Sequence, residues 1–528
     1  MARLLYEDFR RKSALVIGWY PLCDTAGPAR GIIGGSVVTS VEQGQHRATI
    51  HHTSALESPS EPGSPQRPPR DGWLSGLAWQ RWLADNVFPS TATPPATDRR
   101  TVIGYLAAFL LAVAYLLVIP QGRTHLTHVW AEDGRIFLGG AATKNFPLVV
   151  VEPYAGYLHV LPRLFAELAV QLPIGWWASG VAIAAAAVRA AVALLVFTAA
   201  AGHLPSRKLR AVLAAAIILL PSGNSEALNN LANLHWFVIF GAFWALLWRP
   251  TTRWQNCLSA AALLLAVTTS PLGMLLVPLA VARLALPRRR DRVPALAFIV
   301  GMAMQIVPLL SSTSTRERDP FDVTQGLAAA AARVPLVMFT GSELAAGLYP
   351  HALELNSRFY AWPAVLAAVV ALAVAGYGLR YGTSARRFLG IASLCLAAAF
   401  IGVQLYMNWS DLLRIDQPYS VILGQRYSAA PSLFLFTAVL VGLARAPRPQ
   451  LRLVLTVVRV GVAAIILCGI VYQWSSTLGL VRLEGPTWQQ NLGVAEQECA
   501  TGKAEALIDT IPSPWQVDLP CEYLTPQR

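Results

Sequence analysis

The sequence predicts an all-α fold, a polytopic bundle of membrane-spanning helices, and two observations carry this prediction. Of the 528 residues, 55% are hydrophobic and only 13% are charged, whereas soluble domains carry about 25% charged residues. The formal net charge of +13 comes mainly from short clusters of Arg between apolar runs. Cytoplasmic loops of membrane proteins have this distribution, so we expect a multi-pass membrane protein and no nucleic-acid partner.

The first 100 residues differ from the rest of the chain. Residues 57–71 are rich in Pro and Ser, and such segments bury too little apolar surface to fold. We therefore expect residues 1–100 to be a disordered extension, or the product of a start codon assigned too far upstream.

Residues 101–474 form the expected transmembrane domain. Arg99 and Arg100 precede the first apolar run, 102–119, so the positive-inside rule keeps the N-terminus in the cytoplasm. Basic clusters then alternate with further runs, which gives about eleven spans. The later expected spans are residues 176–201, 209–221, 234–248, a two-span hairpin over 257–287, 293–310, 359–379, 388–407, 432–443 and 453–474.

The carboxylates provide a second test of this topology. The expected inner loops hold almost none beyond Asp291. The expected outer loops hold Glu132, Asp133, Glu152, Glu226, Glu317, Asp319, Asp322, Glu343, Glu354, Asp411 and Asp416. The last span leaves residues 475–528 as a short extracytoplasmic tail, where Cys499 and Cys521 could pair because disulfides persist in oxidising compartments.

Glu132 and Asp133, in the first outer loop, are the candidate catalytic residues. A carboxylate at a membrane–water boundary can take a proton from a sugar hydroxyl, or bind a divalent cation such as Mg²⁺ or Mn²⁺ through hard oxygen. The alternative is a pair of solvated loop acids. His125 and His128 nearby do not have the spacing of a zinc site, so no metal-ligating residues are assigned and the cofactor stays open.

The same loop continues into an amphipathic segment, residues 154–172, which Pro162 and Pro173 interrupt. Such a segment can lie in the membrane interface and cover a cavity that faces the lipid. Its polar side chains Tyr157, His159 and Arg163 are therefore candidate substrate-binding residues.

The second outer loop, residues 221–237, is dense in polar side chains. If it is helical, Glu226, Asn229, Asn230 and Asn233 share one face, with His235 close by. Amides offer both donors and acceptors, which suits a polyhydroxyl ligand. The alternative interpretation is a cluster that caps and hydrates the following helix.

Arg426 and Tyr427 stand immediately before a later span, on the expected outer side. The planar guanidinium of Arg suits phosphate, so Arg426 could hold a lipid phosphate. An ordinary flanking arginine is the alternative, but the positive-inside rule places those on the inner side. Arg189 falls near the middle of a span, where it either serves function or bonds the carbonyls of a neighbouring helix.

Several catalytic motifs are absent from the sequence. It has no GxxxxGK[ST], HExxH or GxSxG pattern, which argues against a nucleotide-driven pump, a zinc protease and a serine hydrolase of the elbow type.

Taken together, residues 102 to the C-terminus resemble the GT-C superfamily of integral-membrane glycosyltransferases, particularly its actinobacterial-type members. The resemblance rests on the first-loop pair Glu132-Asp133, the segment 154–159, the run 233–236 and the pair Arg426-Tyr427. It implies a sugar donor carried on polyprenyl phosphate and transfer on the outer face. It also implies a first-loop acid as base or metal ligand, which maps onto Asp133 or Glu132.

The resemblance therefore leads us to expect an inverting glycosyltransferase in the plasma membrane. Asp133 would take the proton of a hydroxyl on a cell-envelope glycan or lipid acceptor, while Arg426 holds the leaving lipid phosphate. The N-terminal extension departs from the family pattern, and the tail is shorter than the outer domains of some members.

Three other functions stay open at this point, and one of them is a non-catalytic scaffold. A transporter or flippase of lipid-linked envelope precursors predicts ionisable residues near the midplane of the membrane and repeated halves. An envelope polymerase or ligase shares most of the features above and differs only in its substrate.

Overall fold

The computed structural model describes residues 76–90, 98–220, 222, 226–311, 323–355, 361–408, 412, 424–444, 452–476 and 484–524. Residues 1–75 of the expected extension lie outside the described residues, as do five acids of the expected outer loops, Glu317, Asp319, Asp322, Asp411 and Asp416. The described residues belong to one compact unit, Arg70–Arg528.

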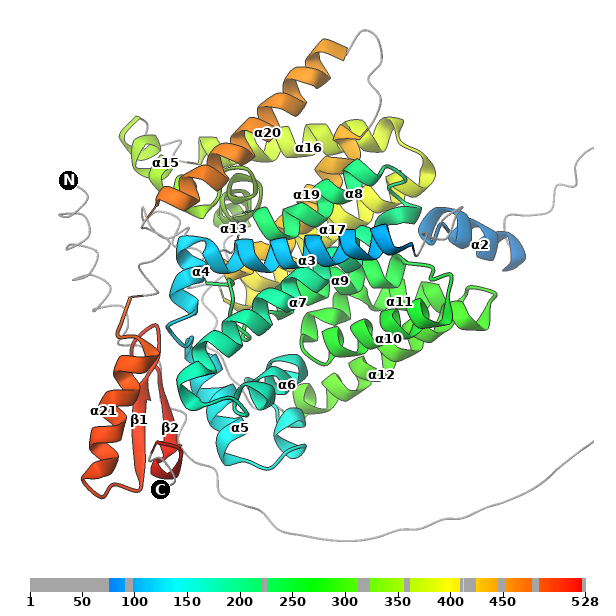
Figure 1. The fold of residues 1–528 in the computed structure, drawn as a ribbon. Coiled ribbons are helices and arrows are strands. Elements are labelled where there is room, and N and C mark those ends of the chain that lie inside the picture. The colour runs from blue at the N-terminus through cyan, green and yellow to red at the C-terminus, as the bar shows by residue number, and fades with distance from the viewer. Residues whose placement is uncertain are drawn as a thin grey trace, which may run out of the picture. The chain divides into compact units, whose positions relative to one another are not determined.

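In the described part of the chain, eight helices are long and apolar enough to cross a membrane. They are α3 (Arg99–Val118), α7 (Trp177–Ala199) with the short turns η4 (Ile174–Trp176) and η5 (Ala200–Gly202), α12 (Arg289–Ser311), α13 (Val323–Ala331) continuing through η7 (Ala332–Leu336) into α14 (Val337–Thr340), α16 (Trp362–Tyr381), α17 (Ser384–Met407), α19 (Arg426–Leu443) and α20 (Arg452–Ser475). Figure 1 shows them joined by shorter helices. The helical, membrane-type fold that composition predicts is confirmed at this level.

The expected number of about eleven spans is not reproduced. Four of the expected spans correspond to shorter helices: α8 (Arg207–Leu219), α9 (His235–Leu247), α10 (Arg253–Val267) and α11 (Val277–Leu284). The longest of these, α10, has 15 residues, whereas a straight span needs about 20. Hydropathy recognised these segments as apolar but did not show that the helices they form are shorter than a span.

The sequence prediction also missed one candidate span. The 18-residue helix Val323–Thr340 contains Arg333 and Pro335, which interrupt its hydropathy signal. Arg333 is fully buried, and its Nε donates a hydrogen bond of 2.9 Å to the carbonyl of Leu412. The charge is therefore accommodated inside the bundle instead of ending the helix.

Helix α9 lies at the centre of the bundle, packed against α7, α10 and α19. Residues 236–247 of this helix are all buried, which explains why its sequence is apolar on every face. Because α9 begins at His235, the buried helix fixes the position of the second expected outer loop.

The last part of the expected N-terminal extension is structured and belongs to the bundle. Helix α2 (Gly76–Trp82) and the π-helical turn η1 (Leu83–Val87) lead to Phe88, which is fully buried. The Phe88 carbonyl accepts a hydrogen bond from Arg249 Nη1 at 3.4 Å. For residues 76–90, disorder is therefore a wrong expectation: Leu83, Val87 and Phe88 supply a short apolar anchor.

The C-terminal tail folds as a small unit that the all-α prediction did not include. Helix α21 (Trp488–Ala500) precedes two antiparallel strands, β1 (Glu505–Asp509) and β2 (Gln516–Pro520), with Glu505 opposite Pro520 and Asp509 opposite Gln516. A disulfide joins Cys499 to Cys521. The remaining described elements are α4 (Pro120–His125), η2 (Asp133–Leu138), α5 (Gly139–Thr143), η3 (Leu148–Val151), α6 (Val160–Ala169), η6 (Pro271–Leu276), α15 (Ser342–Leu355) and η10 (Cys521–Tyr523).

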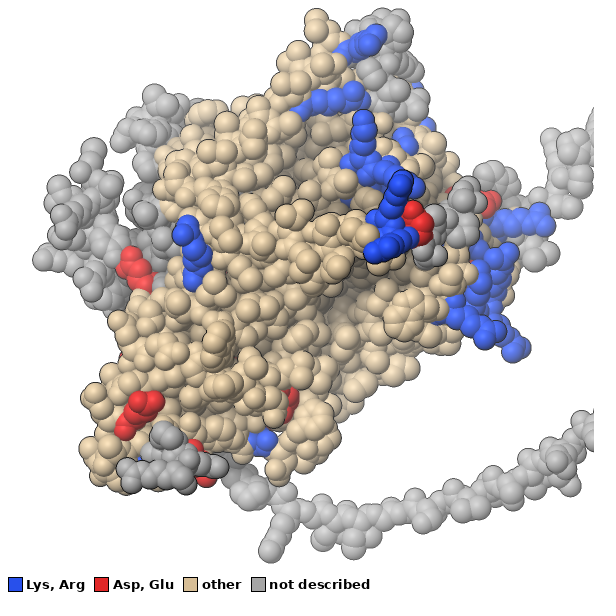
Figure 2. Space-filling model, viewed as in Figure 1, with Lys and Arg blue, Asp and Glu red and all other residues tan. Residues whose placement is uncertain are grey.

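Charge separates the two ends of the bundle. Helices α3, α8, α10 and α12 begin with Arg residues, and we call their shared side the basic end. We call the opposite side, which carries Glu132, Asp133 and Glu226, the acidic end. Figure 2 shows most Lys and Arg side chains of one face near α2, and several Asp and Glu side chains near α21.

Candidate functional site

The C-terminal tail holds the backbone on both sides of the first-loop acids. The N–H of Ala131 donates to the carbonyl of Ile511 at 2.7 Å, and the N–H of Ile511 donates to the carbonyl of Val129 at 2.9 Å. A side chain at Gly134 would crowd this contact, since a Cβ there would lie only 2.6 Å from Cγ2 of Thr510. The loop with the candidate catalytic acids is therefore braced by a segment almost 400 residues later in the chain.

Asp133 is fully buried, and both of its carboxyl oxygens accept hydrogen bonds from the second loop. The backbone N–H of Leu231 donates to Oδ2 and that of Ala232 donates to Oδ1, each at 2.8 Å. Burial raises the pKa of Asp133 to about 8, and the nearby Glu132 also raises it, although the two N–H donors act in the opposite direction. Asp133 thus ties two loops together and presents no free oxygen to a ligand.

Glu132, in contrast, is partly exposed and interacts electrostatically with other candidate residues. Its charge acts on Tyr157 and on Arg426. The two neighbouring acids therefore have different surroundings: Asp133 is buried and bound to the second loop, and Glu132 is partly exposed.

A tight turn positions Tyr157 and His159. Tyr154 and Tyr157 exchange backbone hydrogen bonds of 2.9 and 3.2 Å, and Ala155 and Gly156 between them have positive φ angles of 51° and 84°. The His159 ring stacks on Tyr157 with centroids 4.1 Å apart, and its Nδ1 donates to the Tyr157 carbonyl at 3.2 Å.

Because its Nδ1 is the donor, His159 keeps Nε2 as an acceptor in the neutral ring. Burial lowers the pKa of His159 to about 3, and the charge of His235 contributes in the same direction. Burial also raises the pKa of Tyr157, with smaller contributions from Tyr427 and Glu132. Both groups are therefore neutral at physiological pH.

The second loop is not the helix that its spacing suggested. Its backbone follows bends and turns, and Asn229 has a φ of 49°. Asn229 Nδ2 donates to the carbonyl of Leu116 at 2.7 Å, while the side-chain amides of Asn230 and Asn233 donate to the carbonyl of Glu226 at 2.6 and 2.8 Å.

These amides are buried and hold the loop on itself and on α3. The helical face expected for Glu226, Asn229, Asn230 and Asn233 is therefore wrong, because the three amide side chains bind backbone carbonyls of a non-helical loop.

His235 is oriented by the same loop. Its Nδ1 lies 2.8 Å from the carbonyl of Ala232, the residue whose N–H is bound by Asp133. Nδ1 is therefore the donor, which leaves Nε2 as the acceptor of the neutral ring. In this way Asp133 sets the position of His235 through Ala232.

Glu226 meets the segment that precedes α19. Its Oε1 accepts a hydrogen bond from the N–H of Gly424 at 3.2 Å, and its Oε2 lies 3.8 Å from Arg426 Nη1. Arg426 Nη2 donates to the hydroxyl of Tyr427 at 3.2 Å, and that hydroxyl donates to Asn408 Oδ1 at 3.3 Å. Asn408 is an addition to the site that no sequence pattern predicted.

The structure thus brings together one set of residues from three distant segments, which we call the six-residue cluster. It consists of Glu132, Tyr157, His159, His235, Arg426 and Tyr427. The ring contact of Tyr157 with His159 and the electrostatic interactions described above link these residues. Trp236, next to His235, packs edge-to-face on Tyr427. Arg163, the remaining candidate, instead lies 3.8 Å from Glu152 and lines a separate cavity next to the C-terminal tail.

Two other sequence candidates have structural contacts. Arg189 donates from Nε to the carbonyl of Ile217 at 2.7 Å and stacks on Phe237 at 4.2 Å, which matches the interpretation that it bonds a neighbouring helix. His128 lies 3.1 Å from the carbonyl of Gly485 in the tail. Within the described ranges, no three His, Cys, Asp or Glu side chains are grouped as metal ligands.

No protein-family model, curated protein or solved structure matches this chain.

Proposed function

We propose that the chain is a membrane glycosyltransferase that moves a sugar from a polyprenyl-phosphate donor to a hydroxyl of a cell-envelope glycan or lipid. The observation that carries this proposal is the six-residue cluster, which contains the partly exposed carboxylate of Glu132 and the guanidinium of Arg426, whose Nη2 donates to Tyr427. A carboxylate to accept a proton and a cation to hold a phosphate are the two groups that such a transfer needs.

The sidedness of the reaction follows from charge. Arg-rich helix ends stay in the cytoplasm under the positive-inside rule, so the basic end is the inner end and the acidic end is the outer one. The Cys499–Cys521 disulfide of the tail agrees with an outer location, because disulfides persist in oxidising compartments. The N-terminus is then cytoplasmic, the tail extracytoplasmic, and the membrane is the plasma membrane.

The proposed reaction is a direct displacement. Glu132 takes the proton of the acceptor hydroxyl as its oxygen attacks the anomeric carbon. The bond between that carbon and the phosphate oxygen breaks, and the lipid phosphate leaves with the electron pair. Arg426 stabilises its negative charge, and the configuration at the anomeric carbon inverts.

Glu132, not Asp133, is the base in this proposal. Asp133 is buried with both oxygens bound to backbone N–H groups, so it cannot approach a hydroxyl without breaking these bonds. Its role is that of a positioning residue, which holds the loop containing His235. A divalent cation remains compatible with the chemistry, and chelation of the membranes tests that point separately.

A transporter or flippase of lipid-linked precursors is the competing function. It would use ionisable residues within the bundle. The deeply buried Arg189, however, donates to the carbonyls of Ile217 and Ile218, which supports a structural role. No contact of the described residues specifically favours transport over transfer.

The test uses membranes that contain the full-length protein, radiolabelled polyprenyl-phosphate sugars and a cell-envelope extract. Glu132→Gln should lower transfer of label by about a hundred-fold or more, the usual effect of losing a general base. The matched control is Glu498→Gln, which neutralises a partly exposed acid of α21 that pairs with Lys503 in the described structure. Full activity of Glu132→Gln would show that Glu132 is not the base. No transfer by the wild type from any donor sugar would contradict the proposed glycosyltransferase activity itself.

A further inference from the structure

A second polar site lies between the first loop and the C-terminal tail, outside the six-residue cluster. It is a cavity of about 610 Å³ whose walls include Tyr154 and Arg163 from the first loop and both strands of the tail hairpin. None of the six cluster residues lines it. Tyr154 nevertheless connects the two sites, because its ring centroid lies 5.6 Å from that of His159.

The hairpin presents one face to this cavity. Side chains alternate along a strand, and Ala506, Ile508, Val517 and Leu519 are buried. The opposite face carries Glu505 and Leu507 on β1, and Gln516 and Asp518 on β2, all of which line the cavity. Leu507 stands opposite Asp518 in the register, and its side chain is 55% exposed.

The first-loop wall contains a buried cation, two of whose nitrogen atoms make no hydrogen bond with the described residues. Arg163 is only 3% exposed, and its Nε and Nη1 have no hydrogen-bond partner in the described part of the chain. The nearest carboxylate oxygen, on Glu152, lies 3.8 Å away. Buried donors without an acceptor are costly, so this guanidinium is suited to an oxygen-bearing ligand that enters the cavity.

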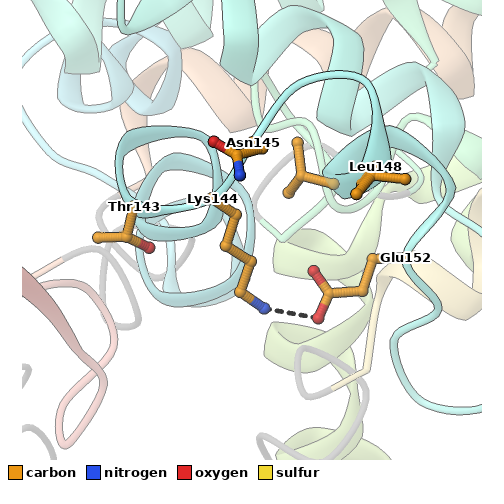
Figure 3. A pocket seen from close by; sticks show the side chains of 6 residues that line it. Thr143, Lys144, Asn145, Leu148 and Glu152 are labelled. Carbon is orange, nitrogen blue, oxygen red and sulfur yellow. Dashed lines mark hydrogen bonds and ion pairs between the residues drawn. The ribbon is translucent and has the colours of Figure 1, made fainter.

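The rim of the cavity is formed by an ion pair. Figure 3 shows Lys144 and Glu152 pointing toward one another beside a smaller hollow of about 340 Å³, with Asn145 and Leu148 nearby. Thr143, Lys144 and Glu152 line both this hollow and the larger cavity. The two spaces therefore share part of their lining, with the ion pair between Lys144 and Glu152 common to both.

The balance of charged side chains in the larger cavity indicates that its ligand is uncharged. Its lining contains three cations, Arg135, Lys144 and Arg163, and three acids, Glu152, Glu505 and Asp518, so the formal charges cancel. A polyanion would need an excess of cations. Neutral sugars match this lining, because their hydroxyls donate to carboxylates and accept from guanidinium and ammonium groups, while Tyr154 and Leu507 offer apolar surface to C–H groups.

We infer that this cavity binds a neutral, hydroxyl-rich oligosaccharide. It serves as the acceptor subsite of the glycosyltransferase, with Tyr154 leading toward Glu132, and in that role the inference rests on the proposed function. The binding itself does not depend on transfer, and the experiment keeps the two questions apart.

The experiment measures binding without donor, by saturation-transfer NMR on the full-length protein in lipid nanodiscs. The probes are the pentaoses of mannose, arabinose and glucose, with pentagalacturonate as the anionic comparison. The Glu132→Gln variant is used alongside the wild type, since it should bind equally well whether or not transfer occurs.

At least one neutral pentaose should bind at millimolar concentration, and pentagalacturonate should bind more weakly. Gln516→Ala and Asp518→Asn change exposed strand residues and should each weaken binding about five-fold, the effect of one lost hydrogen bond. Lys503→Ala, outside the cavity on the same unit, should not. The inference is overturned if no neutral pentaose binds, if the anionic probe binds best, or if the two strand variants bind like Lys503→Ala.

Discussion

The Oδ1 atom of Asp133 accepts a hydrogen bond of 2.8 Å from the backbone N–H of Ala232. The carbonyl of the same Ala232 lies 2.8 Å from Nδ1 of His235. Ala232 therefore links the buried Asp133 of the first loop to the imidazole of His235, a member of the six-residue cluster. The two first-loop acids therefore have different roles: Asp133 holds the second loop in place, and the partly exposed Glu132 is the proposed base.

Asp133→Asn is predicted to lower stability and transfer together. The amide retains one acceptor oxygen but turns an N–H₂ donor toward either Leu231 or Ala232, and two facing donors cost about 1–3 kcal/mol when buried. The measurement is the free energy of unfolding in detergent, beside transfer activity.

Glu132→Gln supplies the contrast for that variant, because the partly exposed Glu132 has no such buried hydrogen bonds among the described residues. It should lose activity with its stability unchanged. If Asp133→Asn were as stable as the wild type and only inactive, Asp133 would be a catalytic residue after all.

The titration of Asp133 predicts a specific pH dependence. Burial raises its pKa in the folded protein to about 8, against about 4 in an unfolded chain. The folded state therefore binds a proton that the unfolded state has released between these values. The contribution of Asp133 to stability is complete below about pH 4, falls as the pH rises toward 8, and is constant above it.

The check is the difference in unfolding free energy between wild type and Asp133→Asn over this pH range. Asn does not titrate, and other groups such as His159 contribute equally to both proteins, so the difference isolates Asp133. The advantage of the wild type should shrink between about pH 4 and pH 8. A difference that stays constant, or grows with pH, would show that the folded pKa is not raised.

Arg426→Lys is predicted to impair the donor site although it keeps the charge. The guanidinium of Arg426 reaches Glu226 with one nitrogen and Tyr427 with another, and a Lys ammonium cannot reproduce this planar fork. Transfer should fall about ten-fold or more, with a higher KM for the polyprenyl-phosphate sugar. Arg253→Lys at the basic end is the matched control and should be without effect.

Sidedness is predicted by the charge difference between the two ends. A cysteine placed at Lys503 in the tail should react with a membrane-impermeant maleimide in intact cells, and a cysteine placed at Arg386 at the start of α17 should react only after permeabilisation. The background is the chain in which Cys23 and the free cysteines of the described residues, Cys257, Cys395 and Cys468, are replaced by serine. The reverse pattern would invert the topology and place the six-residue cluster in the cytoplasm.

Much of the fold was predictable because it depends on local composition. Apolar length and Arg clusters locate most long helices, and the first-loop acids, His235 and Arg426 were recognisable as polar residues beside apolar runs. These signals require no knowledge of distant contacts. The candidate span Val323–Thr340 was not predicted because it contains Arg333. The hydrogen bond of the buried Arg333 to the Leu412 carbonyl is a tertiary interaction that the local sequence does not reveal.

The details of the site were less accessible for the same physical reason. The spacing of Asn229, Asn230 and Asn233 fits a helical face, but the folded loop uses these amides to satisfy its own carbonyls. Likewise, Glu132 and Asp133 are neighbours in sequence, and only the N–H groups of Leu231 and Ala232 distinguish them. The brace between Ala131 and Ile511 joins segments that no local pattern connects.

The contact between the first loop and the tail predicts that Gly134→Ala is destabilising and that a second substitution in the tail can partly correct it. A Cβ at this position would lie 2.6 Å from Cγ2 of Thr510 and 3.2 Å from Cγ1 of Val129, so Gly134→Ala should push the tail away from the loop. Overpacking of this kind costs about 1–3 kcal/mol, and transfer should fall because Glu132 loses its support.

Thr510→Ser removes the Cγ2 methyl that causes the closer of these contacts and should restore part of both stability and transfer to Gly134→Ala. The double-mutant cycle measures this directly: residues in contact show a coupling energy, whereas independent sites add. Gly104→Ala is the control, because a Cβ there meets nothing within 4 Å, and Thr510→Ser should not affect it. Strict additivity of Gly134→Ala and Thr510→Ser would mean that the tail does not brace the loop in solution, and would separate the role of the tail from that of the six-residue cluster.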